Sequence, residues 1–139
     1  MRNLVLFFLF ISGVGYSQTL KINITNLRSS AGSIVLAFYN TQESFSKEEP
    51  LFRRTVSKAT FKNGIVSVTY TDIKPGTYGI AMLDDENGNV KMDYGLILPK
   101  EGFGFSEYWH TGLTKPTLDK FDFILKNEPK TVEIKVKYM

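Results

Sequence analysis

The sequence predicts an all-β fold, a single antiparallel β-sandwich of about seven strands with Greek-key connections. Apolar residues recur mostly at every second position, which is the period of a strand with one buried face. Turn-forming pairs such as Pro75-Gly76 and Asn87-Gly88 separate these runs. No run shows the spacing of an amphipathic helix. Short strands between turns are typical of a sandwich, with a closed barrel as the alternative.

The first half of the chain contains four of the predicted strands. Residues 19–27 alternate apolar and polar side chains, and residues 33–40 are apolar on both faces, as in a central strand. Residues 41–52 form a polar loop with room for a short helical turn. Residues 53–61 are a more polar strand, expected at a sheet edge, and residues 65–71 alternate again. These four segments supply about half of the predicted sandwich.

The second half contains three further strands and two loops. Residues 77–83 alternate after the Pro75-Gly76 turn, and the sequences KFDFIL (120–125) and TVEIKVKY (131–138) close the chain as strands. The segment 95–118 is rich in glycine and aromatic residues and has no clean period. We expect it to be one long ordered loop, and loops of that length usually carry function or are packed by their own side chains.

The N-terminal segment has the layout of a secretory signal peptide. Arg2 precedes an uncharged apolar run at 4–11, and the small residues Gly15 and Ser17 follow. A membrane-spanning helix needs about 20 apolar residues, so this run is too short. The sequence therefore predicts a signal peptide at 1–17, a single domain at 18–139, an exported protein in the periplasm or the medium, and no stable membrane insertion after cleavage.

Composition excludes several classes of function. The chain has no cysteine, and this excludes disulfides and thiol chemistry; with a single histidine, a zinc site is not expected either. Lysine and arginine number 17 against 14 acidic residues, and these charges are scattered along the chain. Nucleic-acid binding is therefore not expected, because it requires a basic cluster.

The loop LDDENGNVKMDYG, residues 83–95, has the oxygen spacing of a calcium site. Asp85, Asn87 and Asn89 fit positions 1, 3 and 5 of such a loop, the carbonyl of Lys91 fits position 7, and Asp93 fits position 9. Two carboxylates would bind calcium weakly, with a dissociation constant of about 10⁻⁴–10⁻³ M. Calcium is the only cofactor that the sequence brings into consideration.

The same residues also fit a simple turn between two strands. Asn87-Gly88 would form its tip, and Asp85 and Asn89 would cap the backbone with side-chain hydrogen bonds. Position 6 of a calcium loop needs glycine for a positive φ, but the chain has Val90 there, and no glutamate follows at position 12. These departures favour the turn over the metal site.

Four aromatic residues are candidates for ligand binding. Phe103, Phe105, Tyr108 and Trp109 fall within the sequence GFGFSEYWH, and aromatic faces stack on sugars and apolar ligands. The alternative is that the rings plug one end of the sandwich, with one helical turn burying Phe105 and Trp109 together. Gly102 and Gly104 would allow close approach to the sheet.

No catalytic constellation stands out. His110 is the only histidine, and Ser106 and Asp119 lie near it in sequence, but no nucleophile motif surrounds Ser106. Glu101 and the other acidic residues show no pairing that would indicate glycoside hydrolysis. We therefore expect a protein without enzymatic activity.

Three stretches together resemble a known bacterial family. NLRSSAGSIVLAFYN, DIKPGTYGIAMLDDENGNVKMD and GLILPKEGFGFS occur in the order and spacing of the exported proteins grouped as DUF2141. The resemblance covers nearly all of residues 18–139 and implies a transthyretin-like (prealbumin-like) sandwich without an assigned activity. The chain departs from the family pattern at Val90, where glycine is usual, and at Leu83-Asp84, where a histidine often precedes the first aspartate.

These observations predict an exported, non-catalytic module of the cell envelope with a binding or accessory role. Its partner would be an envelope protein or a glycan. The alternative is a carbohydrate-binding or small-ligand-binding module that uses the aromatic segment 103–109.

Overall fold

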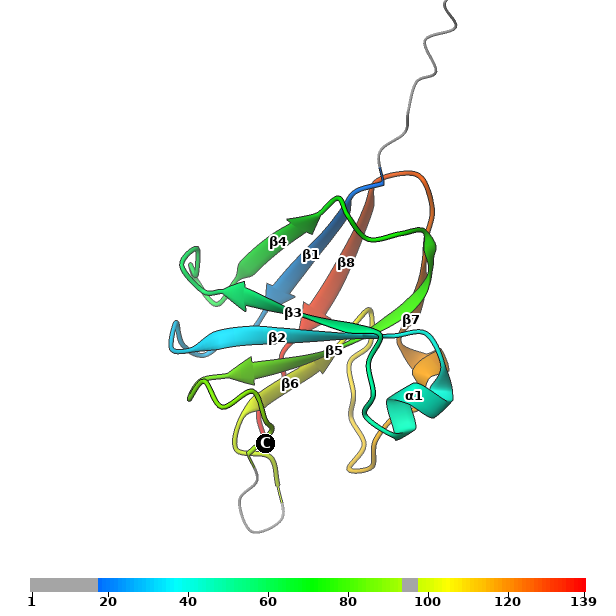
Figure 1. The fold of residues 1–139 in the computed structure, drawn as a ribbon. Helices are drawn as coiled ribbons and strands as arrows, with labels where there is room; N and C mark the ends of the chain where they lie inside the picture. Colours follow the sequence, from blue (N-terminus) through cyan, green and yellow to red (C-terminus); the bar gives the residue numbers. More distant parts are fainter. Residues whose placement is uncertain (1–17, 94–97) are drawn as a thin grey trace, which may run out of the picture.

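The protein consists of two β-sheets packed face to face (Figure 1). The structure is a computed structural model that describes residues 18–93 and 98–139. The smaller sheet has the order β4 (Val66–Tyr70), β1 (Leu20–Thr25), β8 (Lys130–Lys135). The larger has the order β3 (Phe52–Ser57), β2 (Ser33–Tyr39), β5 (Gly76–Asp85), β6 (Gly102–Phe105), and β7 (Asp122–Leu125) also pairs with β5. The predicted all-β sandwich is confirmed, and the predicted signal peptide, 1–17, lies outside the described residues.

Most strand pairs are antiparallel, as predicted, but one is not. β1 and β8 run parallel, with Ile22 opposite Val132 and Ile24 opposite Ile134. These strands lie near opposite ends of the chain, so no hairpin forces them to run in opposite directions. The predicted edge strand is confirmed, since β3 pairs only with β2 among the described strands.

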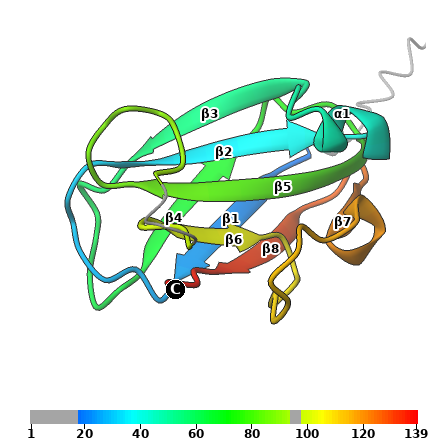
Figure 2. The ribbon, with the colours of Figure 1, turned by 90° about the horizontal axis from the view of Figure 1, so that it is seen from below.

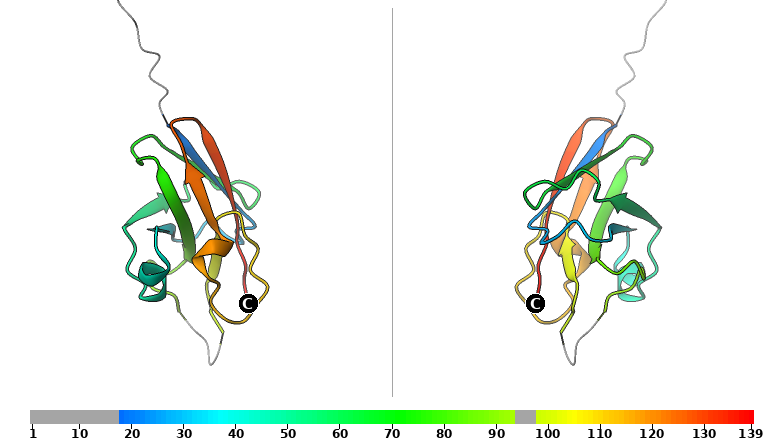
Figure 3. Two further views of the ribbon diagram at one scale, coloured as in Figure 1. Left: turned by 90° about the vertical axis from the view of Figure 1, so that its right-hand side faces the viewer. Right: turned by 90° about the vertical axis from the view of Figure 1, so that its left-hand side faces the viewer.

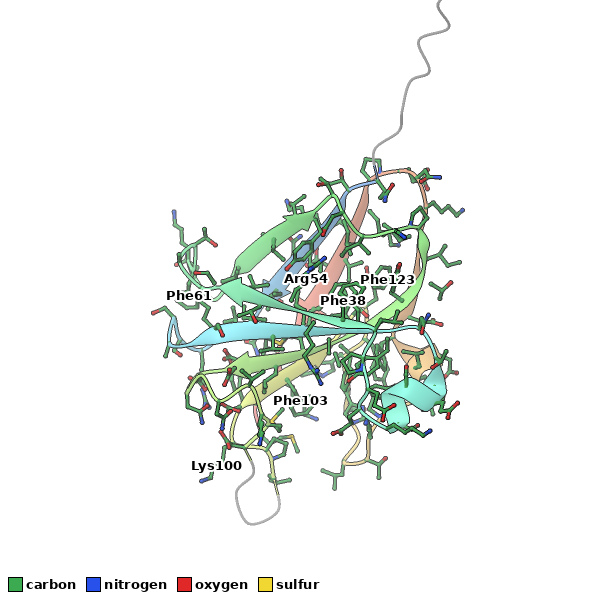
Figure 4. The ribbon with its side chains drawn as sticks, viewed as in Figure 1. Phe38, Arg54, Phe61, Lys100, Phe103 and Phe123 are labelled. Atoms are coloured by element: carbon green, nitrogen blue, oxygen red, sulfur yellow. The ribbon has the colours of Figure 1, made fainter. Side chains whose placement is uncertain are left out.

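The main core lies between the two sheets (Figure 2, Figure 3). Strict alternation in β1 buries Leu20, Ile22 and Ile24 against the other layer. Phe38 from β2 and Phe123 from β7, labelled in Figure 4, lie in the same core. The period-two pattern of the sequence therefore determines which face of a strand such as β1 is buried.

A second hydrophobic cluster covers part of the outer face of the larger sheet. It consists of Tyr39, Phe45, Phe105, Leu118 and Phe121. Phe45 comes from α1 (Gln42–Ser46), which Thr41 caps by accepting the Ser44 N–H. Leu118 begins the 3₁₀ helix η1 (Leu118–Lys120), which lies against α1. The predicted helical turn in the 41–52 loop is thus confirmed, and its role is to bury one phenylalanine.

A buried ion pair joins β5 to the segment after β3. Lys58 and Asp84 contact each other with 2% and 0% of their side chains exposed. Lys58 Nζ also donates to the carbonyls of Ser29 at 3.2 Å and Ala31 at 2.7 Å. Asp84 Oδ2 accepts from the Tyr138 hydroxyl at 2.6 Å. Burial, with the Asp84 hydrogen bond, raises the pKa of Tyr138 well above its usual range, so the phenol stays protonated.

The predicted long loop at 95–118 is interrupted by a strand. β6 pairs with β5, placing Gly104 opposite Met82 and Gly102 opposite Asp84. A Cβ on Gly104 would lie 2.7 Å from Ile134 Cγ2, and one on Gly102 would lie 2.5 Å from a Tyr138 ring carbon. The prediction of a single loop was wrong, whereas the close approach that the glycines allow is confirmed. In the described part of the chain, no helix has the length and apolarity to cross a membrane.

Candidate functional site

A groove of about 490 Å³ opens on the outer face of the larger sheet. Its floor contains Ala37 and Ala81, which are directly opposite each other on β2 and β5. The larger side chains Tyr39, Phe103 and Phe105 stand around them. Phe103 is labelled on β6 in Figure 4. The two alanines face each other between bulky aromatic residues. Their short side chains leave a hollow that larger side chains at these positions would fill.

The sequence produces this groove because β2 is apolar on both faces. Leu36 and Phe38 point into the core, so Val35, Ala37 and Tyr39 must point outward. The part of this outer face nearest α1 is covered by the second cluster, and the part farther along is left open. The presence of apolar residues on both faces of β2 predicted a central strand but gave no indication of a groove.

His110 supplies a polar group to the groove. Only 9% of the residue is exposed, and its ring meets the edge of Phe105 at a centroid distance of 5.8 Å. The Nδ1 atom is buried and has no hydrogen-bond partner among the described residues. A buried polar atom without a partner costs free energy, and the ring would have to turn this atom toward the groove before a ligand could remove that cost.

The candidate catalytic residues have structural partners instead. The Ser106 hydroxyl donates to the Phe121 carbonyl at 2.6 Å and accepts from the Ile80 N–H at 2.9 Å. Asp119 accepts a hydrogen bond from the Thr117 hydroxyl. Ser106 therefore links the second cluster to β5, and its hydroxyl is engaged on both sides.

The four predicted ligand-binding aromatics are divided between two places. Phe103 and Phe105 line the groove. Tyr108 is half-buried against the second cluster, and Trp109 is 43% exposed with Lys135 Nζ 4.7 Å from its ring centroid. The predicted helical turn that buries Phe105 with Trp109 is wrong, because Phe105 belongs to β6 and Glu107, with φ of 55°, reverses the chain just after it.

The acidic loop between β5 and β6 is held by hydrogen bonds from its own backbone. The Asp85 carboxylate accepts the N–H groups of Asn89 at 3.1 Å and Val90 at 3.0 Å. The Asn87 side chain accepts the Asn89 N–H at 3.1 Å, and the Asn89 side chain accepts the Lys91 N–H at 2.9 Å. The predicted capping by Asp85 and Asn89 is confirmed.

Asp93 and Glu101 make further hydrogen bonds with this loop. The amide groups of Asn87 and Asn89 both donate to the Asp93 carboxylate, Asn89 at 2.9 and 3.0 Å. The Asp93 N–H donates to Glu101 Oε2 at 3.3 Å. Across residues 18–93 and 98–139, no three acidic, histidine or cysteine side chains stand close enough together to hold a metal ion. In this conformation the carboxylates of Asp85 and Asp93 accept hydrogen bonds from backbone N–H groups and side-chain amides instead of binding an ion.

Val90 takes the conformation that the sequence indicated would need glycine. Its φ is 62°, in the left-handed region that a β-branched residue rarely enters. Its side chain is 56% exposed and lies at the rim of the groove. The hydrogen bond from its N–H to Asp85 holds the backbone in this strained state.

Replacing Val90 with glycine is expected to stabilise the protein. Relief of the left-handed strain outweighs the extra chain entropy of glycine, for a net gain of about 0.5–1 kcal/mol in the free energy of unfolding. Urea unfolding with EDTA present measures it. Asn63→Gly is the matched control, because Asn63 has φ of 52° but asparagine tolerates that region. A loss of stability in Val90→Gly would contradict the strain.

A protein-family model matches most of the chain. The family model described as "Uncharacterized protein conserved in bacteria (DUF2141)" matches residues 22–133. That span runs from β1 into β8 and includes most of the groove and the whole acidic loop. Comparison with curated proteins and with solved structures gave no match. The chain therefore belongs to the DUF2141 family of bacterial proteins, as its three sequence stretches predicted.

Proposed function

We propose that this protein is an exported, non-catalytic binding module of the cell envelope that holds a small ligand in the outer-face groove. The carrying observation is an apolar groove of about 490 Å³ with the unpartnered Nδ1 of His110 buried at its side. Small-molecule sites commonly measure about 300–1,000 Å³ and combine apolar walls with a few polar groups. Export rests on the predicted signal peptide at 1–17.

The chemistry of the lining defines the class of ligand. Phe103, Phe105 and Tyr39 favour an apolar body of drug-like size, because burying their exposed surface provides the affinity. One hydrogen-bonding group on the ligand would bond to His110 once the ring turns Nδ1 toward the groove, and this bond would fix the orientation of the ligand. Arg53 and Lys115 at the rim favour an anionic end, although Glu48 offsets part of their charge.

The groove supports this role better than Trp109 supports sugar binding. Lys135 lies over the Trp109 ring, so one face of the indole is already covered by a cation. Tyr108 is packed against the second cluster rather than displayed beside Trp109. The proposal therefore takes the small-ligand alternative and places it at Phe103 and Phe105.

A fluorescent probe with an apolar body and one anion tests the proposal. We expect 1-anilinonaphthalene-8-sulfonate to bind the native protein saturably at one site, with enhanced fluorescence. Ala81→Leu adds bulk to the groove floor and is expected to weaken the dissociation constant about tenfold, or about 1.4 kcal/mol. Fluorescence titration measures both proteins, and urea midpoints establish that both are folded.

Thr69→Leu is the matched control, because it introduces the same leucine side chain at an exposed position on β4, in the other sheet. It is expected to leave the dissociation constant unchanged. Equal affinity in wild type and Ala81→Leu, or a signal that does not saturate, would refute binding in the groove.

A further inference from the structure

Glu101 is a buried carboxylate, and one of its two oxygens has no hydrogen-bond partner among the described residues. The residue is 5% exposed, and this oxygen is Oε1. Its other oxygen, Oε2, accepts the Asp93 N–H at 3.3 Å. An unpaired buried charge is costly, and a bound ion is one partner that would remove the cost.

Two further carboxylates, those of Asp85 and Asp93, belong to the loop that Glu101 contacts. Asp85 itself is 1% exposed. A buried carboxylate oxygen without a donor, next to a loop that carries two more carboxylates, is an environment that favours a cation.

We propose that Glu101 completes a calcium site with Asp85, Asn87, Asn89 and Asp93. Calcium takes six to eight oxygen ligands, including mono- or bidentate carboxylates, and tolerates irregular geometry. The sequence had indicated only two carboxylates and no glutamate at position 12. Glu101 supplies the third from the other end of the loop, immediately before β6.

The backbone of the loop already has the required form. Asp85 accepts N–H groups from positions 5 and 6, and Asn87 and Asn89 each accept the N–H two residues ahead. Val90 at position 6 has the positive φ that such loops need. This strained conformation would be maintained at a cost that ion binding offsets.

Ion binding requires a local rearrangement. The three acidic side chains do not converge within metal-ligating distance in the described structure, and Asp93 is held by the amides of Asn87 and Asn89. Withdrawal of those amides from Asp93 would free its carboxylate for the ion, while their oxygens keep the backbone N–H groups that they accept. The rearrangement opposes binding, so we expect a dissociation constant of about 10⁻⁴–10⁻³ M, as in extracellular calcium modules.

Thermal unfolding in EDTA and in 10 mM calcium chloride tests the site. We expect calcium to raise the melting temperature of the wild-type protein by about 5–10 °C, the shift that linkage gives for this affinity and chain length. Isothermal titration calorimetry gives the dissociation constant directly. No shift and no heat of binding would overturn the proposal.

Glu101→Gln separates ion binding from a structural role. It keeps the size of the side chain but removes its charge, so we expect calcium affinity to fall at least tenfold. The melting temperature in EDTA should stay the same or rise, because a buried charge has been removed. A purely structural Glu101 would instead give a lower melting temperature in EDTA and an unchanged calcium affinity, which would overturn the proposal.

Two further variants make the result decisive. Asp93→Asn removes a second carboxylate from the site and should weaken calcium binding to a similar extent. Glu107→Gln is the matched control, since Glu107 is exposed beyond the end of β6. We expect wild-type affinity there; a tenfold loss in Glu107→Gln would show a general charge effect rather than a site.

Discussion

Asp84→Asn is expected to lower the free energy of unfolding by about 3–5 kcal/mol, because it leaves the buried Lys58 ammonium without its counter-ion. The carbonyls of Ser29 and Ala31 still accept from Lys58, but they carry no full charge. The Tyr138 hydroxyl can still donate to the new amide oxygen. Urea unfolding of the two proteins measures the difference.

Asp72→Asn is the matched control for this ion pair. Asp72 contacts Arg54 at 2.7 Å, but the two side chains are 64% and 37% exposed. Solvent screening limits an exposed pair to about 0–1 kcal/mol. Similar losses in Asp84→Asn and Asp72→Asn would show that burial adds nothing to the Lys58–Asp84 interaction.

A double replacement distinguishes the pair from its individual members. Lys58→Met alone should be as damaging as Asp84→Asn, since among the described residues it leaves the buried carboxylate with the Tyr138 hydroxyl as its one side-chain donor. Lys58→Met combined with Asp84→Leu removes both charges and is expected to recover much of the loss. Strict additivity of the single effects would contradict direct coupling.

Phe121→Ala is expected to cost about 3–5 kcal/mol of stability, because it leaves a cavity at the centre of the second cluster. Phe121 is fully buried, and its ring centroid lies 4.8 Å from that of Phe105 and 5.0 Å from that of Phe45. It also packs on Gly79, where a Cβ would come within 2.7 Å of the ring. Urea unfolding measures the loss.

The same replacement should weaken ligand binding in the groove. Phe121 supports Phe105, which forms one wall, so 1-anilinonaphthalene-8-sulfonate should bind less tightly to any folded Phe121→Ala protein. Ile124→Ala is the control, because Ile124 is an exposed residue of nearby β7 and should change stability by no more than about 0.5 kcal/mol. Equal losses at the two positions would contradict a packed second cluster.

The strands were predictable because alternation is a local signal. Leu20, Ile22 and Ile24 occupy one face of β1 whatever that strand packs against, since the side-chain period of an extended chain is fixed. The same argument gave β2 as a central strand and β3 as an edge strand. β6 was missed because its residues, Gly102–Phe105, alternate glycine with phenylalanine and resemble a loop in composition.

The acidic loop was partly predictable. Spacing alone identified the capping oxygens of Asp85 and Asn89 and the need for a positive φ at Val90. It could not identify Glu101, which is eight residues beyond Asp93 and reaches the loop only because β5 and β6 pair. The one sequence signal was Glu101 itself, an acidic residue directly before a glycine-rich strand.

The sequence by itself determined most of the strands, the buried face of those that alternate, and membership in the DUF2141 family, because these depend on local patterns and on the order of motifs. Only the tertiary structure decided the parallel β1–β8 pair, the groove over Ala37 and Ala81, and the Lys58–Asp84 ion pair. Each of these joins residues far apart in the chain. Their contacts depend on which strands pair and in what register, and a local pattern contains no information on either.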